Sequence, residues 1–520
     1  MAKRLCLLFV LMSPIAATAS AQNAADVLRN AASAMGAGPV TSIRITGTGW
    51  NAPVGQGYTP NEDWPRVEVT SYTRVFDYDN RSASEAWTRV QGTYPPRGGG
   101  GLPIQEWGAA VNGEWTQRFY VNEDYAWNLD GGNTTPAPGP RLSSSAAGLR
   151  PEARQLDIWL SPHGFLKAAM AAGNATAVAL TFEGQAKTIV TFTALGKYRV
   201  NGTITADNLV ERVQTWIPNP VFGDMVYEHR YTEYKDYNGV KFPSLVHTHQ
   251  GDPRLNPGHN SQEIRVTGVD VNPAGIAMPV PDNIRQAAGQ PVMIRIASDQ
   301  VAPGVWRIAG ESHNSVAIEF RDFITVVEAP QDERRSLAVI AEVHRLIPNK
   351  PIQYVVNTHY HFDHSGGLRT YVAQGATVVT HAGNRPFYEE VFFYPAPRTL
   401  EPDLLSTRYP WFRQNRLDSI EGVTQKYVIS DGVRTLDVLP LQGIIHDGNM
   451  LVAYLPTEKI LINADMYSPP APNAQPLPRA STPARELAQN IRRLNLIVER
   501  HVPIHGQVGT HEVFLRIVGQ

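Results

Sequence analysis

One stretch of the chain, Asn357 to Gly367, constrains the fold more than any other. Three histidines and an aspartate lie within six positions of it, His359 to His364. The apolar run 352–356 before it predicts a buried strand, and the glycines after it lead into an expected helix, 368–373. Strand, tight loop and helix is the arrangement in which α/β proteins hold chemistry, at the carboxyl end of a strand. Imidazoles and a carboxylate at this density favour a first-row metal such as zinc.

The alternative is a polar loop whose histidines are there by chance. The whole chain has 15 histidines in 520 residues, which makes three within six positions an improbable accident. In a compact loop alternate residues face the same way. His359 and His361 could therefore bind one ion while Asp363 and His364 turn toward a second.

Further metal-binding side chains follow later predicted strands. His446 comes after the apolar run 436–441, Asp465 ends the run 460–465, and His505 precedes a glycine after 502–504. Asp447 could orient His446 or could only form a turn before Gly448. The ends of neighbouring strands meet at one edge of a sheet, so we expect one site.

These residues resemble the metallo-β-lactamase superfamily. Its HxHxDH motif is matched at His359, His361, Asp363 and His364, and its later ligands are matched at His446, Asp465 and His505. The resemblance covers about the last 230 residues. It implies an α/β fold of the αββα sandwich type. The long gap between His364 and His446 is accounted for by an aromatic, proline-rich insertion at 385–420, either a lid or a surface helical hairpin.

The resemblance also implies a metal centre and a reaction. His359, His361 and His446 would hold one zinc ion, Asp363, His364 and His505 a second, and Asp465 would bridge them around a shared water. Asp363 could also accept or relay a proton. The implied reaction is hydrolysis of an ester, thioester, lactone or related bond. The lactam-hydrolysing branches generally lack an aspartate at the place of Asp465, which makes a lactamase a poorer expectation.

Two other function classes stay open. Some branches of the superfamily use iron, so an iron-dependent oxidoreductase on the same fold is one alternative. The other is a lipid-binding protein whose metal domain is inactive. The substrate is expected to be a small molecule, and neither its identity nor the oligomeric state follows from the sequence.

The amino-terminal end has the pattern of a secretory signal. Lys3 and Arg4 precede a short apolar run, and Ala19-Ser20-Ala21 is a suitable cleavage site, so residues 1–21 are expected to be removed. The only cysteine, Cys6, lies inside this segment, which leaves nitrogen and oxygen donors for a metal. We therefore expect a periplasmic or secreted protein.

Residues 22–285 are expected to form a β-rich accessory domain, and residues 286–520 the catalytic domain. Hydrophobic periodicity predicts an antiparallel meander, one helix at 23–35 and one helical segment at 151–172. The sheet weakly resembles periplasmic lipoprotein-carrier domains, mainly through the hairpin pattern 234–243. Residues 131–148 are expected to form a loop rich in glycine, proline and serine. The proline-rich stretch 272–292 marks the boundary, after which a strand is expected at 292–296.

The charge and hydropathy of the chain limit the classes of partner that it is expected to bind. The formal net charge is −2, which gives no electrostatic case for nucleic acid or for an anionic membrane. No other segment is apolar for long enough to span a membrane. Of the remaining candidates, His381 is expected to be structural, and Tyr467 could contact substrate or only pack. Ser365 is a poor nucleophile, and the pair His247 and His249 is a weak second metal site.

Overall fold

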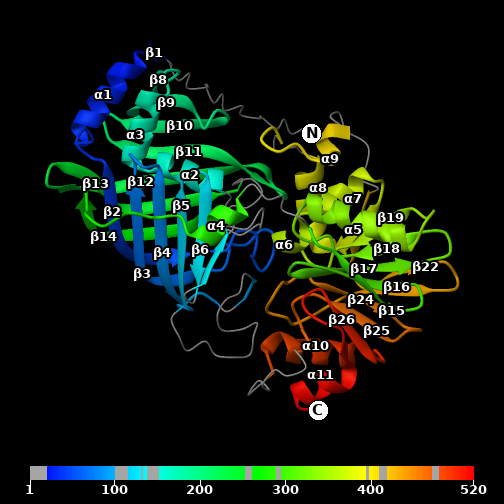
Figure 1. The fold of residues 1–520 in the computed structure, drawn as a ribbon. Helices are drawn as coiled ribbons and strands as arrows, with labels where there is room; N and C mark the ends of the chain where they lie inside the picture. The colour runs from blue at the N-terminus through cyan, green and yellow to red at the C-terminus, as the bar shows by residue number, and fades with distance from the viewer. Residues whose placement is uncertain are drawn as a thin grey trace, which may run out of the picture.

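The structure is a computed structural model of the chain, and it describes residues 20–95, 97–99, 115–130, 133–136, 151–251, 260–288, 294–393, 398–408, 419–470 and 480–520. Most of the expected signal segment, the expected loop at 131–148 apart from 133–136, and parts of the 385–420 insertion lie outside these residues. Three sheets make up the described chain: one of 14 strands, one of seven and one of six. Figure 1 shows the large sheet on one side of the molecule and the two smaller sheets on the other.

The large sheet is antiparallel throughout, as the alternating pattern predicts. Strand β2 pairs with both β3 and β14, so the first long strand and the last lie side by side at its centre. Its strands are β1 (Ser20–Gln22), β2 (Ser42–Asn51), β3 (Val67–Asp77), β4 (Ser82–Val90), β5 (Trp115–Asn122), β6 (Tyr125–Asp130), β7 (Asn133–Pro136), β8 (Thr176–Phe182), β9 (Gln185–Ala194), β10 (Tyr198–Thr205), β11 (Val210–Asn219), β12 (Gly223–Tyr237), β13 (Val240–Gln250) and β14 (Asn260–Val271).

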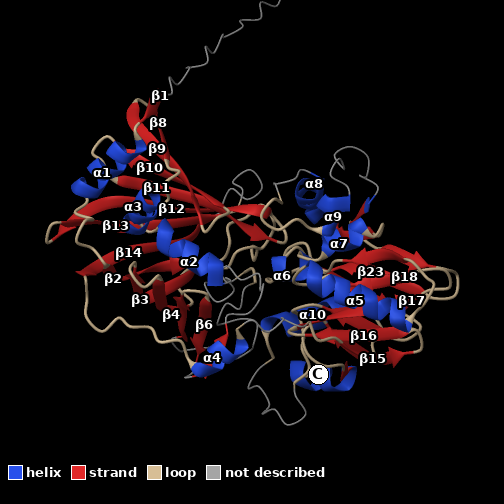
Figure 2. Cartoon of the chain, turned by 45° about the horizontal axis from the view of Figure 1, so that its top comes forward, coloured by secondary structure: helices blue, strands red, loops and turns tan. Residues whose placement is uncertain are grey.

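Three helices pack on this sheet: α1 (Ala24–Ala34), α2 (Pro151–Leu160) and α3 (Pro162–Ala171) (Figure 2). The single helical segment expected at 151–172 is two helices. Ser161 ends the first and caps the second by accepting the backbone N–H of Gly164, and Pro162 then starts α3, where its missing N–H has no cost. A short helix, α4 (Asp282–Ala287), contacts β6 and β7.

A charged network is buried between α2 and the large sheet. Arg74 pairs with Asp157 of α2 and lies 3.0 Å from Glu85, and His229 Nε2 lies 2.9 Å from Asp157. These side chains line a cavity of about 80 Å³. Burial alone would raise the pKa of Asp157, but Arg74 and His229 hold it well below its usual range. The likeness of this half to lipoprotein carriers stays a prediction.

The two smaller sheets form the αββα sandwich that the sequence predicts. The seven-stranded sheet contains β15 (Ala297–Ala302), β16 (Val305–Gly310), β17 (His313–Glu319), β18 (Ile324–Val327), β19 (Ile352–Val356), β20 (Thr377–His381) and β21 (Ile420–Val423). The six-stranded sheet contains β22 (Tyr427–Ser430), β23 (Thr435–Pro440), β24 (Leu451–Leu455), β25 (Ile460–Asn463), β26 (Arg500–Pro503) and β27 (Gly509–Thr510). Buried side chains of both sheets share one core, which includes Val316, Val356, Val452 and Ile462.

Helices cover the outer faces of this sandwich. On the seven-stranded sheet lie α5 (Glu333–Leu346), α7 (Leu368–Ala373), α8 (Arg385–Phe393) and α9 (Leu404–Arg408), and on the other side of the sandwich lie α10 (Thr482–Arg493) and α11 (His511–Val518) (Figure 1). Among the described residues no helix is both long and apolar enough to cross a membrane.

A strand was expected at 292–296. This prediction is wrong for residues 294–296, the part of the range that the structure describes. The first strand begins at Ala297, because the tight turn at Pro303 and Gly304 pairs Ala302 with Val305 and so fixes the register of the hairpin. The change from the large sheet to the seven-stranded sheet falls between Val271 and Ala297. The boundary at 285 stays a prediction within that span.

The two halves share a core. Phe222, in the turn between β11 and β12, packs edge-on against Phe362 at 4.8 Å between ring centres and against Phe387 of α8 at 6.1 Å. Arg398 donates to the carbonyl of Val221, and Asp224 accepts the N–H of Thr399. The described part of the 385–420 insertion is therefore packed between the metal loop and the large sheet. Whether it acts as a lid stays a prediction.

Candidate metal centre

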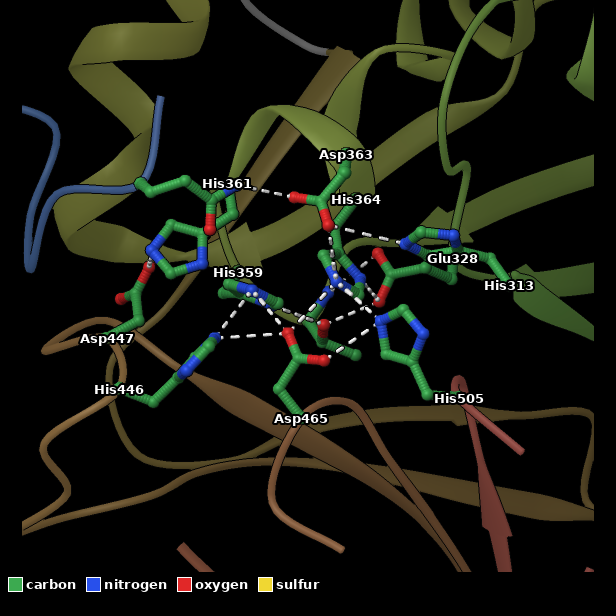
Figure 3. A network of polar contacts seen from close by, with 12 residues as sticks. His313, Glu328, His359, His361, Asp363, His364, His446, Asp447, Asp465 and His505 are labelled. Carbon is green, nitrogen blue, oxygen red and sulfur yellow. Dashed lines mark hydrogen bonds and ion pairs between the residues drawn. The ribbon is translucent and has the colours of Figure 1, made fainter. Parts of the chain in front are cut away.

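The seven predicted ligands lie together at one edge of the αββα sandwich. His359, His361, Asp363 and His364 come from the loop after β19 and from α6 (Phe362–Ser365), and His446 follows β23. Asp465 follows β25 and His505 follows β26. Each therefore lies just past a strand end, which is where the sequence places them. Figure 3 shows contacts from His359, His364, His446 and His505 meeting at Asp465.

The side chains form two groups that each suit a metal ion. The first contains His359, His361, His446 and Asp465, and the second contains Asp363, His364, His505 and His313. The first three imidazoles and the trio of Asp363, His364 and His505 are the sets expected from the sequence. His247 and His249, the weak second candidate, pair with Glu263 and Glu228 instead.

Asp465 contacts both groups through one carboxylate. Its Oδ2 lies 3.2 Å from Nε2 of His359 and 3.1 Å from Nε2 of His446, and its Oδ1 lies 2.9 Å from Nε2 of His505. Its backbone has a φ of 56°, in the left-handed region that aspartate tolerates better than most residues. Burial would raise its pKa, but the imidazoles of His364, His505 and His446 hold the pKa well below the usual range. The carboxylate is therefore ionised.

Sequence reasoning missed His313, the first residue of β17. Its Nε2 is buried without a hydrogen-bond partner and lies 3.4 Å from Oδ2 of Asp363. Because β17 runs antiparallel to β18, its amino-terminal end reaches the same edge as the carboxyl ends of the parallel strands. Burial, with help from the neighbouring His505, lowers the pKa of His313 to about 3. Its imidazole is therefore neutral, as a metal ligand must be.

Glu328, just after β18, was also missed. Its side chain is fully buried, its φ is 75°, and it accepts hydrogen bonds from the hydroxyl of Thr358 at 2.5 Å and the amide of Asn357 at 3.2 Å. Its Oε2 also lies 3.5 Å from Nδ1 of His364. A carboxylate behind a histidine fixes the ring and increases the basicity of its other nitrogen. The only signal for it in the sequence was an acidic residue ending an apolar strand, as Asp465 does.

Hydrogen bonds behind the histidines fix their tautomers. The hydroxyl of Thr358 donates to Glu328, so its oxygen is free to accept Nδ1–H of His359 at 2.9 Å. Nδ1–H of His505 donates to the carbonyl of Ser312 at 2.8 Å, and Nε2–H of His361 to the carbonyl of Gly57 at 2.9 Å. In the neutral form of each ring the remaining nitrogen carries a lone pair and no proton.

This arrangement fits bound cations. The inward nitrogens of His359 and His446 are 3.3 Å apart, and those of His364 and His505 are also 3.3 Å apart. Nδ1 of His361 is buried without a hydrogen-bond partner. Burial, then the nearby His364, lowers the pKa of His359 to about 3, so this ring is neutral at physiological pH. Neutral nitrogen lone pairs and ionised carboxylates that face one another at these distances are the donor set that divalent zinc binds.

The two groups differ in their access to solvent. The side chains of His359, His361 and His364 have no exposed surface, and that of His446 is 3% exposed. The side chains of Asp363 and His505 are 34% and 23% exposed. Solvent therefore reaches the centre at Asp363 and His505.

Other predicted candidates have structural contacts. His381 accepts the N–H of Gly383, the hydroxyl of Ser365 donates to the carbonyl of Tyr360, and Tyr467 packs on Phe514. Asp447 forms a turn, which is one of the two roles considered for it in the sequence. It accepts the N–H of Asn449 in a turn and lies 3.9 Å from Nε2 of His361. Burial raises the pKa of Asp447 to about 7.

Known proteins resemble the carboxyl-terminal part. The chain is similar to a metallo-beta-lactamase from Pontibacter korlensis, with 14% identity over 43% of this chain and 98% of that one, at a TM-score of 0.31. It is similar to the metallo-beta-lactamase FIM-1 from Pseudomonas aeruginosa in its mono-zinc form, with 19% identity over 42% and 92% of the two chains and a TM-score of 0.30. No curated protein matches the sequence.

The family evidence comes from the segment that carries the metal loop. Residues 310–447 match the model of the metallo-beta-lactamase superfamily, from the strand of His313 to the turn of His446 and Asp447. The match includes the HxHxDH motif, and the two sheets around it have the sandwich fold that the motif predicts. Residues 310–447 of this chain therefore match the metallo-beta-lactamase superfamily, and the carboxyl-terminal part has the fold of that superfamily.

Proposed function

We propose that the protein is an exported hydrolase with a dinuclear zinc centre, which cleaves an ester, thioester, lactone or related bond of a small molecule. The observation that carries the proposal is Asp465, whose two oxygens contact histidines of both ligand groups. His359, His361 and His446 would hold one ion, and His364, Asp363 and His505 the other, with His313 beside the second. Two bound zinc ions supply Lewis-acid chemistry, which lowers the pKa of water and polarises the bond to be cleaved.

The residues of this chain account for the remaining requirements. Burial would raise the pKa of Asp363, but His364 and His313 hold it well below its usual range, so its carboxylate is ionised and would readily pass on any proton that it accepts. Oδ2 of Asp363 lies on the solvent-exposed side of the centre, 3.4 Å from His313 and 3.6 Å from His364. A proton accepted there stays within reach of two imidazoles, which can pass it on.

Export is supported only by the sequence of residues 1–21. Export would place the metal centre in an oxidising compartment. The one cysteine of the chain is Cys6, inside the expected signal, so the mature protein would have no thiolate that could be oxidised. Amino-terminal sequencing of the protein from the growth medium or periplasm tests this directly. A mature chain that begins at Gln22 supports export, and a cytoplasmic chain that retains Met1 overturns it.

The test of the centre is metal analysis joined to turnover. The purified full-length protein is expected to hold about two zinc ions per chain and to hydrolyse at least one of a lactone, thioester, phosphodiester and lactam panel. His361→Ala and Asp465→Ala are expected to abolish turnover. Full activity after complete removal of metal would overturn the proposal, and bound iron with oxygen consumption would assign the protein to the oxidoreductase class.

A further inference from the structure

The segment between β2 and β3 lies against the metal loop of the other half of the molecule. The carbonyl of Gly55 accepts the N–H of Phe362 at 3.3 Å, and the carbonyl of Thr59 accepts the hydroxyl of Tyr360 at 3.1 Å. The carbonyl of Tyr58 accepts the N–H of Gly448, two residues after His446, at 2.8 Å. Figure 3 shows the amino-terminal part of the chain as a blue ribbon beside His361. This segment therefore borders the centre.

Two of its hydrogen bonds reach predicted ligands directly. Nε2 of Gln56 donates to Oδ1 of Asp363 at 2.8 Å. The next residue, Gly57, accepts Nε2–H of His361 at 2.9 Å through its carbonyl. Asp363 belongs to one ligand group and His361 to the other. Neighbouring residues of the amino-terminal half thus contact one ligand of each metal ion.

Each bond has a consequence for the ligand it reaches. The donation to Gly57 leaves Nδ1 of His361 without a proton, and Figure 3 shows this nitrogen turned toward His359 and His446. The amide of Gln56 occupies Oδ1 of Asp363, so that Oδ2 faces His313 and His364. Partners of this kind fix ligand orientation before a metal binds, which is why their loss lowers metal affinity.

The close approach depends on glycine on both sides of Gln56. A Cβ on Gly55, whose φ is 77°, would lie 2.2 Å from the ring of Phe362, and one on Gly57 would lie 2.6 Å from the hydroxyl of Tyr360. A second amino-terminal segment adds Gly99, where a Cβ would lie 2.4 Å from Oε1 of Gln56 and 2.6 Å from Cε1 of His361. Three glycines therefore let the backbone of one half reach the ligands of the other.

We propose that Gln56 is a positioning residue of the metal centre, which holds Asp363 in its ligating orientation, and that the segment 55–58 makes the amino-terminal half an integral part of this centre. This inference rests on the proposed function, because it concerns the same two ions. It assigns the amino-terminal half a role in metal binding that a separate accessory or carrier domain would not have. Gln56 acts through Asp363 and is not itself a ligand.

The test uses the full-length protein and zinc affinity measured by competition with a chromophoric chelator. Gln56→Ala removes the side chain, and Gln56→Met keeps its length and volume but removes the amide. Both are expected to weaken the binding of one ion by about 10-fold, the lower end of the effect of such partners. The other ion should bind as in the wild type. Asn61→Ala is the matched control, since it removes an exposed amide from the same stretch between β2 and β3.

The outcomes separate the inference from the proposed function. If Gln56→Met retains the wild-type thermal midpoint but loses affinity for one ion, Gln56 acts on the ligand and not only on packing. If both Gln56 variants bind two ions with wild-type affinity, the inference is wrong while the proposed function stands. If the wild-type protein binds no zinc, the proposed function fails first.

Discussion

Nε2 of His364 lies 2.9 Å from Oδ2 of Asp465. Each of these two side chains also contacts other predicted ligands of the same centre. Asp465 contacts both groups through its carboxylate, His359 and His446 on one side and His364 and His505 on the other. A substitution of Asp465 should therefore show whether one carboxylate holds both metal ions.

Asp465→Asn is expected to reduce bound zinc from about two ions per chain to about one, and to lower kcat at least about 100-fold, since loss of an outer partner alone costs up to about that much. An amide keeps the shape but loses the charge that attracts both cations. Metal analysis of dialysed protein and steady-state kinetics measure the two effects. Asp207→Asn, at an exposed turn, is the control. Two tightly bound ions in Asp465→Asn would refute the bridging role.

Glu328→Gln tests the carboxylate behind His364. An amide of the same shape cannot accept hydrogen bonds at both oxygens from Thr358 and Asn357, so a buried polar group loses its partner, at a cost of about 1–3 kcal/mol. We expect a lower thermal midpoint for the metal-free protein and weaker zinc binding, read by chelator competition. An unchanged zinc affinity would show that Glu328 serves only the fold.

Phe222→Ala tests the shared core between the two halves. The ring contacts Phe362 and Phe387, and removal of a buried phenylalanine ring costs about 3–5 kcal/mol. Urea unfolding followed by tryptophan fluorescence should show a lower midpoint. Phe182→Ala, at a side chain that is 61% exposed, should change the free energy of unfolding by less than about 0.5 kcal/mol. Equal effects of the two substitutions would contradict the interface described above.

His163 should make the amino-terminal half sensitive to acid. Burial lowers the pKa of His163 from 6.5 to about 4, so the unfolded chain binds a proton below pH 6.5 that the folded chain does not. Stability is therefore complete above that pH and falls as the pH drops toward 4, by about 1.4 kcal/mol for each unit of pKa difference. His163→Phe, which can stack on Phe242 as the imidazole does, should flatten this decline in urea midpoints. A decline as steep as that of the wild type would exclude His163 as a source.

The sequence predicted those parts of the centre that are local or that follow strands of recognisable pattern. The four ligands from His359 to His364 are adjacent in the chain, and His446, Asp465 and His505 each follow an apolar run. His313 was missed because it begins its strand, and only the antiparallel pairing of β17 and β18 brings that end to the site. Its position depends on a sheet order that hydrophobic alternation does not contain.

Gln56 was missed for a different physical reason. Its contact with Asp363 depends on how two separately patterned halves dock, and no local preference encodes docking. The flanking glycines Gly55 and Gly57 were the available signal, and they read as an ordinary loop. The large sheet itself was predicted as an antiparallel meander, because alternation is a local signal that does not depend on docking.

The pairing of β2 with β14 has a consequence for the order in which the chain is made. Gln56 follows a strand that has one neighbour, β14, synthesised only at residues 260–271, and His505 is synthesised later still. Long-range pairing of this kind forms slowly and late. A chain that stops before His505 therefore has no complete centre to capture an ion, and the centre can mature only after that residue has been made.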